Sequence, residues 1–163
     1  KLIGGPQSGI IVGRKDIIKQ LKDHPLARAL RLDKTVTAAL NATLISYVEN
    51  RAKEEIPIWK MIALSPDELK TKTSNWAAMI GEQAKVVRSK TMIGGGALPD
   101  TSLPTWCLAI NYDDGAENLS ALLRSQPTPI ISRIENNLVL IDPRTIEDDD
   151  EAILVRELSN IFD

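Results

Sequence analysis

The chain contains almost none of the residues that bind transition metals or form disulfides: Cys107 is its only cysteine and His24 its only histidine. One cysteine cannot form an internal disulfide, and the two residues provide neither a zinc site nor a Cys/His or Ser/His/Asp catalytic set. No apolar run approaches the roughly 18 uncharged residues that a membrane helix needs, and the first residues lack a signal-peptide profile. We therefore expect a cytoplasmic protein without a metal site or a membrane segment.

Length and composition restrict the class of protein further. The 163 residues, with a mass of 17.9 kDa, are 43% hydrophobic and 26% charged, which is typical of one globular domain or of a short segment joined to a smaller domain. The net charge of -2 argues against nucleic-acid binding by bulk electrostatics alone. Because the chain opens with Lys1 and not with methionine, we interpret it as a piece of a longer polypeptide.

Charge is distributed unevenly along the sequence. Residues 14–34 carry seven basic side chains against three acidic ones, so this stretch could meet an anion. Residues 144–163 carry two basic side chains against seven acidic ones, five of which form a run at residues 147–151. We interpret that run as a solvated helix start, because carboxylates favour the positive end of the helix dipole.

Hydrophobic periodicity predicts an alternation of helices and strands. Ile10, Ile11 and Val12 form a β-branched run closed by Gly13, which predicts a short buried strand. Further strands are predicted at residues 84–88, 106–111, 130–134 and 138–141, and helices at residues 16–22 and 34–47, around residues 119–123, and at residues 150–162.

One helix has start and stop signals that can be read directly. Ser65 and Glu68 have the spacing of a capping box, and Pro66 stands at the first helical position, where its missing N–H costs nothing. Gly81 is a natural stop. The predicted helix therefore starts at Ser65 and ends at Gly81, and the whole pattern is that of an α/β protein without internal repeats.

Five stretches of the sequence together resemble one known family. They are KLIGGPQSGIIVG at residues 1–13, HPLARALRLDK at residues 24–34, GGGALP at residues 94–99, LPTW at residues 103–106 and PIISRI at residues 129–134. The chain resembles bacterial selenocysteine synthase, the L-seryl-tRNA(Sec) selenium transferase family, over nearly all of its length. The resemblance implies the end of the large domain (residues 1–50) and the C-terminal small domain (residues 51–163) of an α/β, fold-type I (aspartate aminotransferase-like) enzyme.

The resemblance assigns the cofactor chemistry to the first residues. The family's lysine before Leu-Leu/Ile-Gly-Gly-Pro-Gln forms a Schiff base with pyridoxal 5'-phosphate, which implies that role for Lys1. A lysine amine suits the role because burial or a neighbouring cation can make it neutral and nucleophilic, which a guanidinium cannot become. Gly4 and Gly5 are implied to let the backbone approach the cofactor closely, and they equally suit a tight turn before a strand.

Arg28 and Arg31 are the second group of candidate site residues. If residues 27–32 are helical, the i,i+3 spacing places both guanidiniums on one side, where they could hold a tetrahedral oxyanion. From the residues alone, two solvated surface arginines are the simpler interpretation. With the resemblance, the family's paired arginines fall on these positions, which implies that they bind the selenium donor, selenophosphate.

The resemblance also implies a complete reaction. Seryl-tRNA(Sec) displaces Lys1 from the cofactor, the Cα proton and the seryl hydroxyl leave to give dehydroalanyl-tRNA, and selenium from selenophosphate then adds to the β-carbon. The tRNA is expected to bind mainly through a region upstream of Lys1, and the enzyme is expected to be a homo-oligomer, a ring of dimers. Because the upstream half of the cofactor domain is missing, we expect this fragment alone to be inactive.

Two other functions are compatible with the same residues. One is a pyridoxal-phosphate-dependent lyase or transferase acting on a small amino acid or amino sugar, and the other is a non-catalytic oligomerisation fragment. Arg133 is expected to make a structural salt bridge, because an aminoacyl-tRNA ester offers no free carboxylate. His24 is expected to be structural, and Cys107 to be a small buried apolar residue.

Overall fold

The structure, a computed structural model, describes residues 1–94 and 100–162. The chain divides into two compact units, residues 1–60 (unit 1) and residues 61–163 (unit 2), which are described separately. This division lies later in the chain than the boundary after residue 50 that the resemblance implies. The two domains that the resemblance implies therefore stay a prediction.

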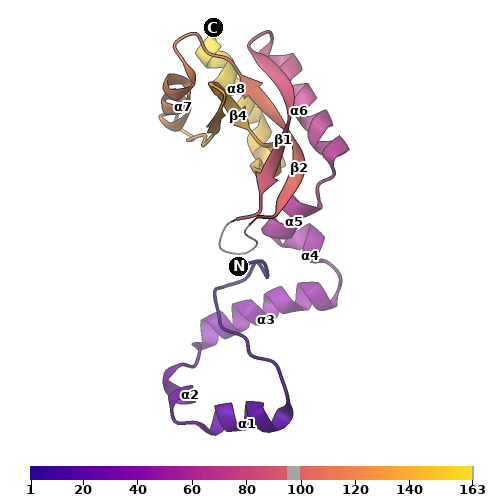
Figure 1. Cartoon of the computed structure of the whole chain (residues 1–163), viewed down its shortest axis with the longest axis vertical. Coiled ribbons are helices and arrows are strands. Elements are labelled where there is room, and N and C mark those ends of the chain that lie inside the picture. Colours follow the sequence, from indigo (N-terminus) through magenta and orange to yellow (C-terminus); the bar gives the residue numbers. More distant parts are fainter. Residues whose placement is uncertain (95–99, 163) are drawn as a thin grey trace. The chain divides into compact units, whose positions relative to one another are not determined.

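Unit 1 is helical. It contains α1 (Lys15–Asp23), α2 (Leu26–Ala29), α3 (Lys34–Val48), α4 (Ala52–Glu55) and the start of α5 (Pro57–Ala63) (Figure 1). The helices predicted at residues 16–22 and 34–47 are confirmed as α1 and α3. Helix α3 begins where it does because the Asp33 carboxylate accepts a hydrogen bond from the Val36 N–H, at 2.9 Å.

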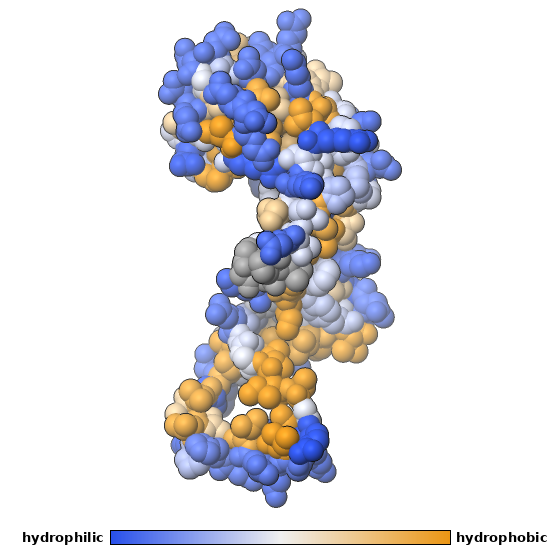
Figure 2. Space-filling view, in the orientation of Figure 1, coloured by the Kyte–Doolittle hydropathy of each residue, from blue (hydrophilic) through white to orange (hydrophobic). Residues whose placement is uncertain are grey.

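Unit 1 has no apolar core of its own. Among its residues only Ser46 and Ile56 are buried, and the space-filling view shows broad apolar surface on this part of the molecule (Figure 2). The strand predicted at residues 10–12 is wrong: this segment pairs with no strand that the structure describes, and Ile11 and Val12 are 70% and 87% exposed. The described residues offer it neither a neighbouring strand nor an apolar layer, and a strand needs both.

Unit 2 is built on a four-stranded antiparallel sheet. Its strands are β1 (Ala84–Met92), β2 (Ser102–Ile110), β3 (Arg133–Glu135) and β4 (Leu138–Ile141), in the spatial order β1-β2-β4-β3. All four strands are predicted from the sequence, although β1 and β2 are longer than expected and β3 is shorter. The loop joining β1 to β2 includes residues 95–99, so most of the GGGALP stretch lies outside the described residues.

Three helices cover one face of this sheet (Figure 1). They are α6 (Pro66–Ile80), α7 (Ala116–Arg124) and α8 (Glu151–Phe162), and short 3-10 turns at Pro143–Thr145 (η1) and Asp148–Asp150 (η2) join β4 to α8. The core between helices and sheet contains Trp76, Leu108, Ile110, Leu119, Leu123, Val139, Ile141, Leu154 and Leu158. The alternation of side chains along β2 and β4 turns these strand residues toward the helices, so unit 2 is a two-layer α/β structure.

The predicted capping box of α6 is confirmed. The Ser65 hydroxyl accepts a hydrogen bond from the Glu68 N–H, and the Glu68 carboxylate accepts one from the Ser65 N–H at 2.8 Å. Pro66 is the first helical residue, and Gly81, with φ of +97°, ends the helix. These contacts lower the pKa of the Glu68 carboxyl, chiefly through its hydrogen bond with the Ser65 side chain.

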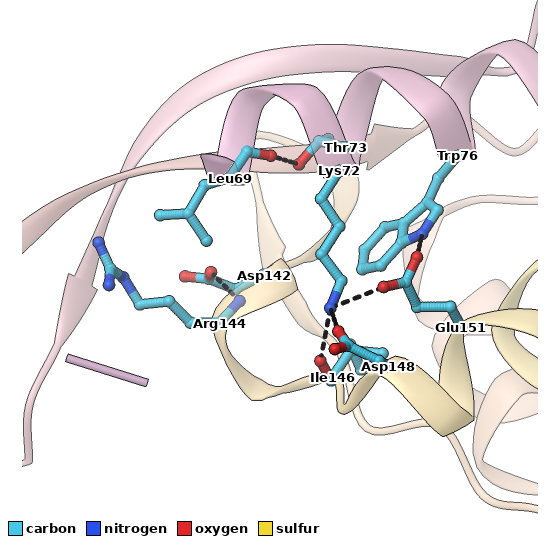
Figure 3. Close-up of polar contacts among 9 residues, drawn as sticks. All are labelled: Leu69, Lys72, Thr73, Trp76, Asp142, Arg144, Ile146, Asp148 and Glu151. Carbon is cyan, nitrogen blue, oxygen red and sulfur yellow. Dashed lines mark hydrogen bonds and ion pairs between the residues drawn. The ribbon is translucent and has the colours of Figure 1, made fainter. Parts of the chain in front are cut away.

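The ammonium of Lys72 connects distant segments of unit 2. Lys72 on α6 donates to the Ile146 carbonyl and pairs with Asp148 and Glu151 at 3.0 and 2.8 Å (Figure 3). Although burial lowers the pKa of Lys72, its hydrogen bonds with Glu151 and Asp148 raise it above the ordinary value overall. The acidic run at residues 147–151 is predicted from the sequence to be a solvated helix start. Two of its carboxylates, those of Asp148 and Glu151, instead form ion pairs with Lys72 on α6.

Candidate functional site

Lys1 lies in a tight turn on the surface of unit 1. The Gly4 N–H donates to the Lys1 carbonyl at 3.0 Å, which closes the turn. The Lys1 side chain is exposed, and its ammonium makes no hydrogen bond or ion pair with any residue that the structure describes. The amine is therefore free for chemistry, and nothing in the described chain buries it.

Gly4 and Gly5 are needed because their own chain packs against them. Gly4 has φ of +82°, and a Cβ added there would collide with the Ile56 side chain. A Cβ added at Gly5 would lie 2.6 Å from the hydroxyl oxygen of Thr43 on α3. The close approach that these glycines permit here is to α3 and to Ile56. Their role toward a cofactor stays a prediction.

Two aromatic side chains, Tyr47 and Trp59, also hold this turn. The Tyr47 hydroxyl, at the end of α3, donates to the Ile3 carbonyl at 2.8 Å and lies 3.2 Å from the Leu2 carbonyl. Trp59 on α5 in turn donates its indole N–H to the Tyr47 hydroxyl. Sequence reasoning missed both residues, because no local pattern indicates a contact between positions 44 residues apart.

Arg28 and Arg31 do not share a helix face. Helix α2 covers only Leu26–Ala29, so the condition for that i,i+3 arrangement, a helix over residues 27–32, is not met. Leu30 closes the last turn by donating its N–H to the Leu26 carbonyl, and the chain beyond it extends to place Asp33 as the cap of α3. Both arginines are exposed and unpaired among the described residues.

Within unit 1, the described residues do not bring these arginines to Lys1. Figure 1 shows α2 well away from the first residues of the chain, with much of α3 between them in this view. An anion held by Arg28 and Arg31 of one chain would therefore not meet Lys1 of the same chain in this conformation.

Arg133, the weaker candidate, is held by its own unit. Its guanidinium donates to the Lys90 carbonyl at 3.0 Å and to the Ser89 hydroxyl at 2.6 Å, and its Nε lies 3.3 Å from the Glu135 carboxylate. The expected structural salt bridge is thus present. A groove of about 690 Å³ lies beside these residues on the outer part of the sheet and is lined by Arg88, Ser89, Lys90, Ser102, Pro104 and Glu135.

His24 and Cys107 have the structural positions that we expect. His24 Nδ1 accepts a hydrogen bond from the Leu26 N–H at 3.2 Å, at the start of α2. Cys107 is fully buried on the sheet face opposite the helices, together with Ala109 and Leu140, and burial raises the pKa of its thiol to about 11. Within the described ranges no group of His, Cys, Asp or Glu could hold a metal ion, and no described helix is long and apolar enough to span a membrane.

The sequence matches one family over most of its length. A model of the L-seryl-tRNA selenium transferase family matches residues 1–147. An L-seryl-tRNA(Sec) selenium transferase of Geotalea daltonii is 41% identical over 169 residues, which cover 99% of this chain and 37% of that protein. The transferase of Aquifex aeolicus is 38% identical, with the same two coverages. That of Moorella thermoacetica is 39% identical over 97% of this chain and 35% of the relative.

Among solved structures, a protein described as D-glucosaminate-6-phosphate ammonia-lyase covers 91% of this chain, with a TM-score of 0.53 and 18% sequence identity. At this identity the likeness shows a shared fold, and it confirms the expected α/β class. Our chain covers 38% of that structure, and it likewise spans little more than a third of the length of the curated relatives. On the family match and on relatives about 40% identical, the chain belongs to the L-seryl-tRNA selenium transferase family.

Proposed function

We propose that the protein to which this chain belongs converts seryl-tRNA(Sec) to selenocysteinyl-tRNA(Sec), with selenophosphate as the selenium donor and pyridoxal 5'-phosphate as the cofactor. The observation that carries this proposal is the family match over residues 1–147, which includes both Lys1 and the two arginines. Since the chain spans little more than a third of its relatives, the activity belongs to the longer protein and not to this chain alone.

Lys1 is the residue that would hold the cofactor. Its primary amine is exposed and unpaired among the described residues, and its backbone is held by the turn and by Tyr47. A free amine on an anchored backbone fits covalent attachment to an aldehyde, and no second lysine lies within the Lys1–Gly5 turn. When bound, pyridoxal phosphate supplies an electron sink for the negative charge that develops at the serine Cα.

The same nitrogen would also move the proton. When it is not bound to the cofactor, the Lys1 Nζ would act as the base that takes the Cα proton. A lysine suits this work because it can exist as a neutral amine near neutral pH when its surroundings lower its basicity, whereas an arginine stays charged. Residues outside this chain would have to supply those surroundings, since Lys1 is exposed here.

Arg28 and Arg31 would bind the selenium donor. Both guanidiniums are exposed and lack partners among the described residues, so they could receive a tetrahedral anion without first breaking an ion pair. Because α2 lies well away from Lys1, we infer that the two arginines complete the site of another subunit. This inference agrees with the homo-oligomer, a ring of dimers, that the resemblance implies. We further propose that the enzyme works in the cytoplasm.

The test uses the protein at the full length of its relatives, loaded with pyridoxal phosphate and given seryl-tRNA(Sec) and selenophosphate. We expect selenocysteinyl-tRNA from the unaltered protein, none from Lys1→Ala, and a raised KM for selenophosphate with Arg28→Ala or Arg31→Ala. Arg14→Ala is the matched control, because Arg14 is an exposed arginine of unit 1 whose one ion-pair partner among the described residues is Asp16. Turnover of a free amino acid or amino sugar without a selenium product would instead favour a lyase.

A further inference from the structure

Two consecutive hydrogen bonds from the aromatic side chains of Trp59 and Tyr47 hold the turn that carries Lys1. The Trp59 indole N–H donates to the Tyr47 hydroxyl, and that hydroxyl donates to the Ile3 carbonyl at 2.8 Å. A tyrosine hydroxyl has a single proton. Since Trp59 occupies the hydroxyl oxygen as a donor, the tyrosine proton is directed toward the carbonyl groups of Ile3 and Leu2.

Packing makes this contact stiff. Gly4 lies against Ile56 with no room for a side chain, and Gly5 also lies too close to Thr43 on α3 for a side chain. The Gly4 N–H also closes the turn onto the Lys1 carbonyl at 3.0 Å. Hydrogen bonds thus hold the chain at the Lys1 carbonyl and at the Ile3 carbonyl. The Lys1 side chain remains free to rotate.

The hydrogen bond from the Tyr47 hydroxyl has two interpretations: it stabilises the fold, or it positions the Lys1 amine. The two interpretations differ in what they predict. A purely structural bond would alter stability and leave the reactivity of each folded molecule unchanged. If the bond positions the amine, its loss would displace the amine. Covalent bond formation and proton transfer slow down strongly when the reacting groups are displaced by about 1 Å.

We propose that Tyr47 and Trp59 are positioning residues that set the backbone of Lys1, and through it the direction of the lysine amine toward the cofactor. This inference rests on the proposed function of Lys1. Tyr47 acts directly on the carbonyl groups of Leu2 and Ile3, and Trp59 acts through Tyr47 by fixing the direction of its hydroxyl proton.

The first experiment needs no cofactor. Hydrogen exchange of peptides covering residues 1–9 is measured in the cofactor-free protein at the full length of its relatives, for the unaltered chain and for Tyr47→Phe. Phenylalanine keeps the ring and removes only the hydroxyl, so exchange of the Gly4 amide should accelerate about tenfold. Tyr112→Phe is the matched control, because Tyr112 packs its ring against Phe162 in unit 2.

The second experiment uses the loaded enzyme. With Tyr47→Phe we expect kcat to fall about tenfold with the KM values for seryl-tRNA(Sec) and selenophosphate unchanged, because a misplaced amine slows the chemical steps without weakening substrate binding. The visible absorbance of the lysine-bound cofactor should change its pH dependence in the same variant. Trp59→Phe should produce a smaller change in the same direction, and Trp106→Phe, in unit 2, should produce none.

Each outcome decides one claim. If Lys1→Ala abolishes the product while Tyr47→Phe leaves exchange, kcat and the absorbance profile unchanged, the positioning role is wrong and the proposed function stands. If Lys1→Ala still yields selenocysteinyl-tRNA, the proposed function itself fails. Should Tyr47→Phe not fold, Trp59→Phe provides the same readouts, and unchanged exchange and kcat in that variant overturn the inference.

Discussion

Arg144 is a buried cation whose partners are mainly backbone carbonyl groups. Its guanidinium donates to the carbonyls of Met61 at 2.6 Å, Leu64 at 3.0 Å and Pro104 at 2.9 Å, although only 5% of the residue is exposed. Burial lowers the pKa of this guanidinium, and the nearby Asp142 opposes the change. The residue joins the end of α5 and Leu64 to β2, which only a planar group with several donors could do.

Replacing Arg144 with lysine should therefore destabilise unit 2. One ammonium cannot reach carbonyls on both sides, so at least one buried oxygen would lose its donor, at a cost of about 2 kcal/mol. Urea unfolding of the 163-residue chain measures the change. Arg124→Lys, at an exposed position in the last turn of α7, should leave the free energy of unfolding within about 0.5 kcal/mol of the parent. Equal losses in both variants would contradict this account.

The buried thiol of Cys107 gives a prediction about pH. Its pKa rises from 9.0 to about 11, mainly through burial, so the folded chain keeps the neutral thiol where an unfolded chain loses the proton. The resulting stabilisation is fully present below pH 9 and is lost as pH rises toward 11. Cys107→Ala should flatten this part of the curve of unfolding free energy against pH. An identical alkaline slope in both proteins would show that other groups cause it.

At the scale of elements, helix α6 is the part of the fold with the clearest local signal. Serine, proline and glutamate at its start and glycine at its end act within a few residues, so no tertiary contact is needed to place the helix. The buried side chains of Leu69, Thr73 and Trp76 then fix which side faces the core.

Ser65→Ala should cost about 1 kcal/mol of unfolding free energy, because the amide of Glu68 loses its acceptor. Ser74→Ala, in the interior of the same helix, is the matched control and should not destabilise the chain.

The contribution of Glu68 to the free energy of unfolding depends on pH. Its folded pKa is lowered, so its stabilisation is present above the ordinary value of 4.5 and is lost as pH falls through the folded pKa. Glu68→Gln should remove that acid dependence.

Apart from α1, which its helical periodicity alone indicates, the elements that sequence patterns predict correctly are those stabilised within unit 2 or by local caps. Helices α3 and α6 and the hairpin β3–β4 belong to this group. The segment at residues 10–12 has the composition of a strand, yet a strand also needs neighbours, and the described residues provide none. Helix α2 ends at Ala29, before Arg31, and the chain then extends so that Asp33 caps α3.

The candidate site shows the same division. Lys1, Arg28 and Arg31 follow from motifs that resemble the family. Tyr47 and Trp59 could not be predicted, because their contact depends on how α3 and α5 bring distant positions to the first turn.

At the scale of the whole molecule, the two units differ in what stabilises them. Unit 2 has a core of at least nine large apolar side chains between helices and sheet, whereas Ser46 and Ile56 are the only buried residues of unit 1. Buried apolar area is the main favourable term in folding. We therefore expect the chain to unfold in two parts.

Hydrogen exchange on the 163-residue chain tests this expectation. Amides of α6, β2 and β4 should exchange only through global unfolding of unit 2, whereas those of α1 should exchange at least about a hundredfold faster. The same chain, mixed with pyridoxal phosphate, should neither retain the cofactor through gel filtration nor form product. Equal protection of α1 and α6 would refute the two-part view, and a visible absorbance band that Lys1→Ala removes would refute the inactivity of the fragment.

The uncovered aliphatic side chains of Ile11, Val12 and Leu30 have a consequence for the fate of the polypeptide in a cell. Chaperones and quality-control proteases recognise short exposed aliphatic segments as a mark of incomplete folding. A nascent or truncated product that exposes these side chains would be retained or degraded. A product in which other residues bury them would not be recognised. The exposed segment at residues 10–12 would therefore mark an incompletely folded product for these proteins.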